Sequence, residues 1–242
     1  MQSTPKSALI KKLLRYAFIG VIIPAVIIFM CVMLFKYDKY AVIIITAAIL
    51  SCIPFFIKFE RGSHTAEEIM LVAVMTALAV AGRIVFAPLP SIKPVTAVVI
   101  FTGIYFGGEA GFMTGALSGL ISNIFFGQGP WTPFQMLSWG IIGFAAGIIA
   151  PILKKGKLPL CIYGLISGVS FSLMMDIYTV LWQEQGGFNI ERYIFYVAAS
   201  LPVMITYSIT NIIFLLLLAG PLGRRLMRIT IKYGIDSNKT KF

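Results

Sequence analysis

Acidic side chains and histidine are scarce in this sequence: nine Asp and Glu and a single His stand among 242 residues. A serine–histidine pair would have to use His64, which lies in a polar loop beside Glu67 and Glu68, with no second metal ligand nearby. An aspartyl dyad needs two aspartates within apolar segments, and only Asp176 lies in one. The sequence also lacks the Gly-x-x-x-x-Gly-Lys-Ser/Thr motif of nucleotide-binding loops. We therefore expect no enzyme activity, no metal site and no cofactor.

Cysteine is equally rare, with three residues in the whole chain. Cys31, Cys52 and Cys161 each lie inside an apolar run and far from one another in sequence. This placement is typical of small buried side chains and not of disulfides or metal ligands.

Apolar residues make up 59% of the chain and charged residues 12%, and the mean hydropathy is +0.92. This composition predicts an all-α polytopic membrane protein. Eight apolar runs are separated by polar or Gly/Pro-containing segments, and the fourth is short for a spanning helix. The expected spans are 16–35, 40–57, 69–86, 95–106, 110–126, 136–153, 158–182 and 193–219.

The net charge of +11 is concentrated in short runs between the apolar segments, which favours a membrane topology signal over nucleic-acid binding. With eight spans, most of the 20 Lys and Arg lie on the side of the two termini, so both termini are expected to be cytoplasmic. The basic residues on the outer side are Lys36, Lys39, Arg83, Lys93 and Arg192. We expect two N-terminal helices in 1–60, a six-helix domain in 61–223 and a basic cytoplasmic tail in 224–242.

The loop 127–135, Gly-Gln-Gly-Pro-Trp-Thr-Pro-Phe-Gln, combines helix-breaking residues with an aromatic ring and uncharged polar groups. Such a mixture suits a small organic ligand. An interfacial turn with a tryptophan anchor is an equally good interpretation.

Two charged side chains lie in the outer parts of expected spans, Arg83 and Asp176. Each costs roughly 2.5–3.5 kcal/mol at a helix centre on insertion scales, so a role is expected for both. At similar depth they could pair and fix helix packing, or Arg83 could extend to the membrane interface instead. Alternatively, they could form a polar floor beneath the outer loop. Asn123 and Asn211 add polar groups that could also tie helices together.

Small residues recur every four positions in three of the spans, which places them on one helix face and lets helices approach closely. Internal packing is the default interpretation, and docking of another membrane protein is the sharper one for the alanine row. The rows are Ala73, Ala77 and Ala81; Gly111, Gly115 and Gly119; and Gly164 and Gly168.

Several motifs follow one another in a defined order. They are Ala73-Val-Met-Thr-Ala77 with Ala81, Ile92-Lys-Pro-Val95, Gly107-Gly-Glu-Ala-Gly-Phe-Met-Thr-Gly-Ala-Leu-Ser-Gly119, and the 127–135 loop before Trp139-Gly140. In these motifs the chain from about Ile69 onward resembles the S components of energy-coupling factor (ECF) type vitamin transporters. The two N-terminal spans are extra to that family's six helices.

The resemblance implies a subunit of the bacterial cell membrane that binds a micronutrient from outside. It further implies docking, through Ala73, Ala77 and Ala81, on a membrane coupling subunit (the T component) driven by two cytosolic ATPases. Transport would then proceed by reorientation of the whole S component. The Gly-Pro-Trp-Thr-Pro loop looks most like the cobalamin-linked branch.

The expected substrate site combines loop contacts with groups from the walls and floor, in which aromatic rings stack on the ligand and amides orient it. Its residues are Arg83, Asn123, Gln128, Trp131, Gln135, Trp139, Asp176 and Tyr178. Two other functions compete with this hypothesis: an ion-coupled carrier that uses Asp176, and a membrane scaffold that transports nothing.

Overall fold

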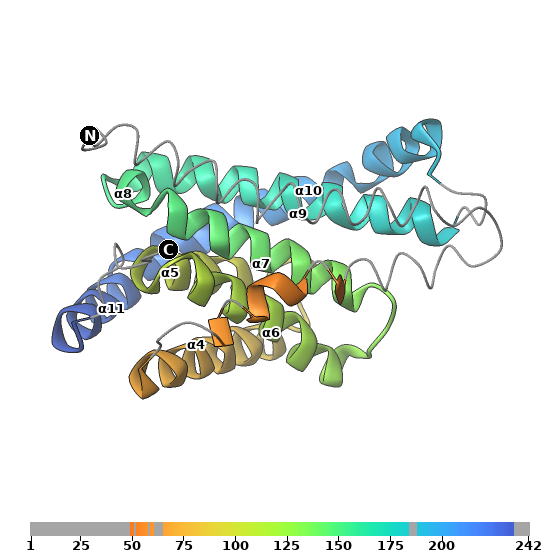
Figure 1. Cartoon of the computed structure of the whole chain (residues 1–242). Helices are drawn as coiled ribbons and strands as arrows, with labels where there is room; N and C mark the ends of the chain where they lie inside the picture. The colour runs from red at the N-terminus through yellow and green to blue at the C-terminus, as the bar shows by residue number, and fades with distance from the viewer. Residues whose placement is uncertain (1–48, 51, 58, 61–64, 184–187, 235–242) are drawn as a thin grey trace, which may run out of the picture.

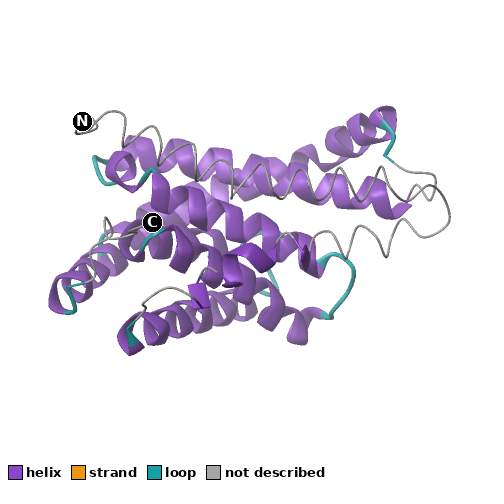
Figure 2. Ribbon diagram, in the orientation of Figure 1, coloured by secondary structure: helices purple, strands orange, loops and turns teal. Residues whose placement is uncertain are grey.

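A computed structural model describes residues 49–50, 52–57, 59–60, 65–183 and 188–234. Helices make up this part of the chain, and it contains no strand, which confirms the predicted all-α class (Figure 2). The helices are α4 Ala66–Val85, α5 Val95–Phe106, α6 Gly108–Phe126, α7 Thr132–Ile148, α8 Ala150–Leu153, α9 Lys157–Gln183, α10 Ile190–Ala219 and α11 Pro221–Lys232. The expected span 16–35 and most of 40–57 lie outside the described residues.

Three of the described helices, α4, α9 and α10, are long and apolar enough to cross a membrane. The short run 95–106 is explained by its position: α5 is apolar on all sides, and nearly all of it is buried among the other helices. It is therefore a core helix of the bundle and not a lipid-facing span (Figure 1).

The helix ends follow local sequence signals. At the start of α4, Thr65 and Glu68 form a capping box, in which each side chain bonds the other's backbone N–H at 3.3 Å. Gly107 separates α5 from α6, and Gly127 ends α6; both have positive φ, which glycine adopts without steric cost. Asn189 caps α10 by accepting from the backbone N–H of Glu191 and Arg192.

The bundle is built from two closely packed helix pairs, α6 with α7 and α9 with α10 (Figure 1). The glycine rows make both contacts possible. A Cβ at Gly111 would lie 2.4 Å from Gly143 O, and one at Gly168 would lie 2.5 Å from Ser208 Oγ. Such distances are shorter than any side chain tolerates, so the glycines serve internal packing, as the default interpretation predicted.

The described end of the second apolar run, residues 49–50 and 52–57, contacts the bundle through Phe55. Phe55 stacks on Phe112 with ring centroids 3.8 Å apart and meets Phe144 edge-on at 5.1 Å. Phe55 is 2% exposed, so this part of the run contacts the bundle as well as its surroundings. Cys52 is buried beside it as expected, and it is a free thiol.

Candidate functional site

A hydrogen-bonded polar cluster lies where α6 ends and α7 begins, around the fully buried side chain of Asn123. Asn123 Nδ2 donates to Thr132 Oγ1 at 2.8 Å and to Gln135 Oε1 at 2.9 Å. Thr132 Oγ1 in turn donates to Gln128 Oε1 at 3.0 Å. The loop between α6 and α7 is thus held by the amide groups that the sequence placed in the site, Asn123, Gln128 and Gln135.

Arg83 joins this cluster from α4. Its Nη1 donates to Asn123 Oδ1 at 2.8 Å and also to Ser122 Oγ. The guanidinium carbon lies 4.7 Å from the centre of the Phe126 ring and 5.2 Å from that of Trp139. Arg83 therefore combines charge-assisted hydrogen bonds with cation–π contacts, an arrangement that holds a planar cation at a fixed place.

A row of aromatic rings continues from Arg83 into the bundle. Trp139 of α7 stacks on Phe171 of α9 at 5.1 Å, and Phe171 contacts Tyr207 of α10 at 5.2 Å. The Trp139 indole is 2% exposed, and no described residue accepts a hydrogen bond from its Nε1. A buried N–H without an acceptor is rare and indicates a position where a ligand oxygen could bind.

Asp176 does not pair with Arg83, which corrects the pairing that their similar depth suggested. Asp176 is buried, and its Oδ2 accepts from Ser200 Oγ of α10 at 2.7 Å. Arg83 instead bonds to α6. Depth along a helix does not specify rotation about its axis, and the two side chains point to different neighbours. Asp176 ties α9 to α10 and lies outside the polar cluster.

The other two aromatic residues of the expected site are also apart from the cluster. Tyr178 packs on Phe134 at 5.3 Å and on Trp182 at 6.2 Å. Trp131 is 36% exposed and lies over Gly129 in the loop. The structure therefore brings together Arg83, Asn123, Gln128, Gln135 and Trp139, and places Trp131, Asp176 and Tyr178 around this group.

A second cation lies near Arg83. The ammonium group of Lys93 donates to the carbonyl oxygens of Phe86, Ala87 and Leu89, just past the end of α4. These carbonyls belong to the turn that follows α4, where those of Phe86 and Leu89 also accept backbone N–H groups. A cation at the C-terminal end of a helix also interacts favourably with the helix dipole. Partial burial, followed by the charge of Arg83, lowers the pKa of Lys93. Two cations, Arg83 and Lys93, thus lie at this end of the bundle.

Sequence reasoning missed several members of the site: Ser122, Phe126, Thr132, Phe171 and Tyr207. Ser122 and Thr132 could have been found as polar neighbours of Asn123 and Trp131. Phe171 and Tyr207 gave no signal, because an aromatic residue in an apolar span has the same pattern whether it faces lipid, core or ligand. Among the described residues no group of three or more His, Cys, Asp or Glu could hold a metal ion.

The alanine row of α4 faces outward from the bundle. Ala73, Ala77 and Ala81 are exposed, and so are their neighbours Val74 and Leu78, at 55% and 44%. The opposite face of α4 is buried against α5 and α6. The row therefore does not serve packing within the described part of the chain.

The family model for the S component of ECF-type riboflavin transporters matches residues 63–228, which is well over half of the chain. The chain belongs to this family. This S component is thus a substrate-specific membrane component of vitamin transport, and the family is one of transporters and not of enzymes. The family implies a small-molecule substrate and partnership with T and ATPase subunits.

Two curated proteins resemble this S component at lower similarity. A UPF0397 protein of Vibrio atlanticus (strain LGP32) is 26% identical over 140 residues, which cover 50% of this chain and 75% of that protein. A UPF0397 protein of Aliivibrio fischeri (strain MJ11) is 24% identical over 139 residues, which cover 50% and 74%. No solved structure matches the chain.

Proposed function

We propose that this S component captures a planar vitamin at the end of the bundle closed by the loop between α6 and α7, and delivers it with a T component and two ATPases. The observation that carries the proposal is the Arg83–Trp139 stack with an indole N–H that lacks an acceptor. Aromatic rings can contact a planar ligand, while Arg83 and the indole N–H can hydrogen-bond its polar edge.

The first ligand to test is riboflavin, because the matched family model is named for it. A flavin has an apolar planar face and a polar edge with acceptor oxygens, which suits the cations and donors of this site. Cobalamin, to which the sequence of the 127–135 loop pointed, is the second ligand. The comparisons lend no support to the cobalamin branch.

We expect the purified protein to bind riboflavin without ATP. Because a ligand that binds only the folded state stabilises it, riboflavin at 100 times its dissociation constant should add about 2.7 kcal/mol to the free energy of unfolding. The measurement is the unfolding temperature in detergent across a panel of vitamins, with cobalamin and thiamine as comparisons. If no member of the panel raises the unfolding temperature, the proposal loses its basis.

We further propose that the exposed alanine row binds the T component, as the family's docking helix would. Ala77→Leu should prevent co-purification of the T and ATPase subunits while vitamin binding stays within about twofold, because a branched side chain holds two helices apart where only a methyl group fits. Ala199→Leu, at an exposed alanine of α10, is the matched control and should leave the complex intact. Equal loss of the complex in both variants would argue against the alanine row as the docking surface.

The orientation that we propose places the site outside the cell. The start of α4, α8 and α11 lie at one end of the bundle, and the loop between α6 and α7 lies at the other (Figure 1). The first of these ends carries Lys154, Lys155 and Lys157 and the arginines of α11. Positive charge favours the cytoplasmic side, so the termini are proposed to be cytoplasmic and the polar cluster extracytoplasmic.

A further inference from the structure

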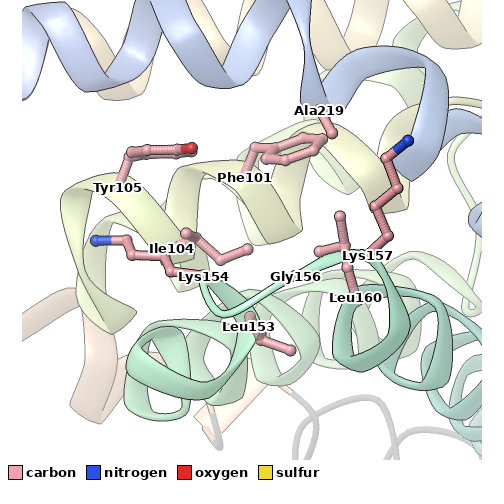
Figure 3. A pocket seen from close by; sticks show the side chains of 9 residues that line it. All are labelled: Phe101, Ile104, Tyr105, Leu153, Lys154, Gly156, Lys157, Leu160 and Ala219. Carbon is pink, nitrogen blue, oxygen red and sulfur yellow. The ribbon is translucent and has the colours of Figure 1, made fainter.

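A cavity of about 180 Å³ lies at the end of the bundle opposite the polar cluster (Figure 3). It has room for several water molecules at ~30 Å³ each. Its walls come from α5, α9, the end of α10 and the turn between α8 and α9. The lining residues are Phe101, Ile104, Tyr105, Leu153, Lys154, Gly156, Lys157, Leu160 and Ala219, none of which is acidic.

Two lysines and a phenol give the cavity its polarity. The ammonium groups of Lys154 and Lys157 lie on opposite sides of it, and the Tyr105 hydroxyl points toward Phe101 (Figure 3). The Lys154 ammonium lies 5.3 Å from the centre of the Tyr105 ring. The floor is apolar, formed by the buried side chains Phe101, Ile104 and Leu160. A cavity with cations at the rim and an apolar floor fits an anionic amphiphile.

The surface around the cavity has the character of a membrane interface. Next to it, Leu158 is 71% exposed and Ile152 is 53% exposed, although lysines stand close to both in sequence. Large exposed apolar side chains beside basic ones are typical of segments that lie at the level of the lipid headgroups.

The helix α11 extends this surface. It packs on the cavity wall through Gly223, where a Cβ would lie 3.0 Å from the Tyr105 hydroxyl. Leu226 is buried on its inner face, whereas Met227 and Ile231 are 55% and 74% exposed among basic residues. The basic residues of α11 are Arg224, Arg225, Arg228 and Lys232, all exposed. An amphipathic helix with four cations lies in the plane of the interface and attracts anionic lipid.

We propose that this cavity binds the headgroup phosphate of an anionic phospholipid from the leaflet at this end of the bundle. The phosphate lies between Lys154 and Lys157 and accepts from the Tyr105 hydroxyl, and the acyl chains run over Ile152 and Leu158. Bound lipid would hold α11 and the α8–α9 turn at the membrane surface. The proposal concerns the end opposite the vitamin site and does not depend on vitamin binding.

The test uses the full chain in detergent, titrated with phosphatidylglycerol and, separately, with phosphatidylcholine, with bound lipid counted by native mass spectrometry. Phosphatidylglycerol should be retained and phosphatidylcholine should not. A cation at an anionic headgroup contributes about fivefold in affinity, so K154Q together with K157Q should weaken phosphatidylglycerol binding about 25-fold. K155Q is the matched control, because Lys155 lies in the same turn and does not line the cavity; it should change affinity less than twofold.

A second variant separates the cavity from general surface charge. Ala219→Leu fills the cavity and leaves every charge in place, and it should weaken phosphatidylglycerol binding by more than fivefold. It also decides the matter if the double lysine variant does not fold. Equal weakening by K155Q and K157Q, or no effect of Ala219→Leu, would overturn the proposal. Displacement of the lipid by 10 mM inorganic phosphate would overturn it as well, since the site would then take soluble phosphate.

Discussion

Arg83→Ala should weaken vitamin binding about 100-fold, the largest loss that we expect from one substitution in the site. Arg83 bonds Asn123 and lies against the rings of Phe126 and Trp139, so a ligand that enters this cluster contacts it directly. Hydrogen bonds to a charged group contribute roughly 1.5–3 kcal/mol, and the upper part of this range corresponds to about 100-fold in affinity. Isothermal titration of the purified protein with the vitamin identified by the thermal screen measures the effect.

Two further variants at the same end of the bundle make this result specific. Arg83→Lys keeps the positive charge but loses the planar fork and the stacking surface, so it should bind with intermediate affinity. Arg192→Ala removes an exposed arginine from the first turn of α10 and should leave affinity within about twofold. Wild-type affinity of Arg83→Ala, in a protein that unfolds at its usual temperature, would show that the ligand binds elsewhere.

Gly143→Leu should separate α6 from α7 and cost the protein much of its stability. A Cβ at Gly143 would lie 2.3 Å from Gly111 O and 2.7 Å from Val99 Cγ1. The closest obstacle is backbone, which no rotamer change can move, so two helices must shift. Overpacking costs about 1–3 kcal/mol in ordinary cores, and the upper value corresponds to roughly a 10 °C lower unfolding temperature.

The chain supplies a control for this substitution. No atom lies within 4 Å of a Cβ built at Gly156, so Gly156→Leu should change the unfolding temperature by less than about 2 °C. Thermal unfolding of the two detergent-solubilised variants gives the comparison. If Gly143→Leu and Gly156→Leu unfold at the same temperature, α6 and α7 are not packed as closely at Gly143 as the structure indicates.

The helices α4 to α7, α9 and α10 could be predicted from the sequence because polar and glycine- or proline-containing breaks separate the apolar runs. The helix α11 was not predicted, because most of it lies in the segment expected to be a basic tail. The ends of α6 follow from Gly107 and Gly127, and the start of α4 from the Thr65–Glu68 pair. The sequence did not show that α5 is a core helix. Its apolar residues fit a lipid-facing and a fully buried helix equally well, and only the packing of its neighbours decides between them.

The polar half of the site was predictable and the aromatic half was not. A buried amide such as Asn123 must find partners, and the nearest polar groups are in the loop that follows it. Phe171 and Tyr207 lie on α9 and α10, far along the chain from the loop. They face the site only because of how these helices are rotated about their axes, which the sequence does not specify. The same missing information made the Arg83–Asp176 pair wrong: Asp176 follows Phe171 by five residues, roughly 140° around α9.

The two faces of α4 have a consequence for transport. Arg83 points into the polar cluster, and Ala81, only two residues earlier, lies on the exposed alanine row. The proposed vitamin site and the proposed docking surface for the coupling subunit would thus share one helix, α4. If the coupling subunit favours one position of α4, it changes the affinity of the protein for the vitamin. By thermodynamic reciprocity, the vitamin then changes the affinity for the coupling subunit by the same factor. Binding of the vitamin and binding of the coupling subunit would then be coupled directly through α4, without rearrangement of the other helices.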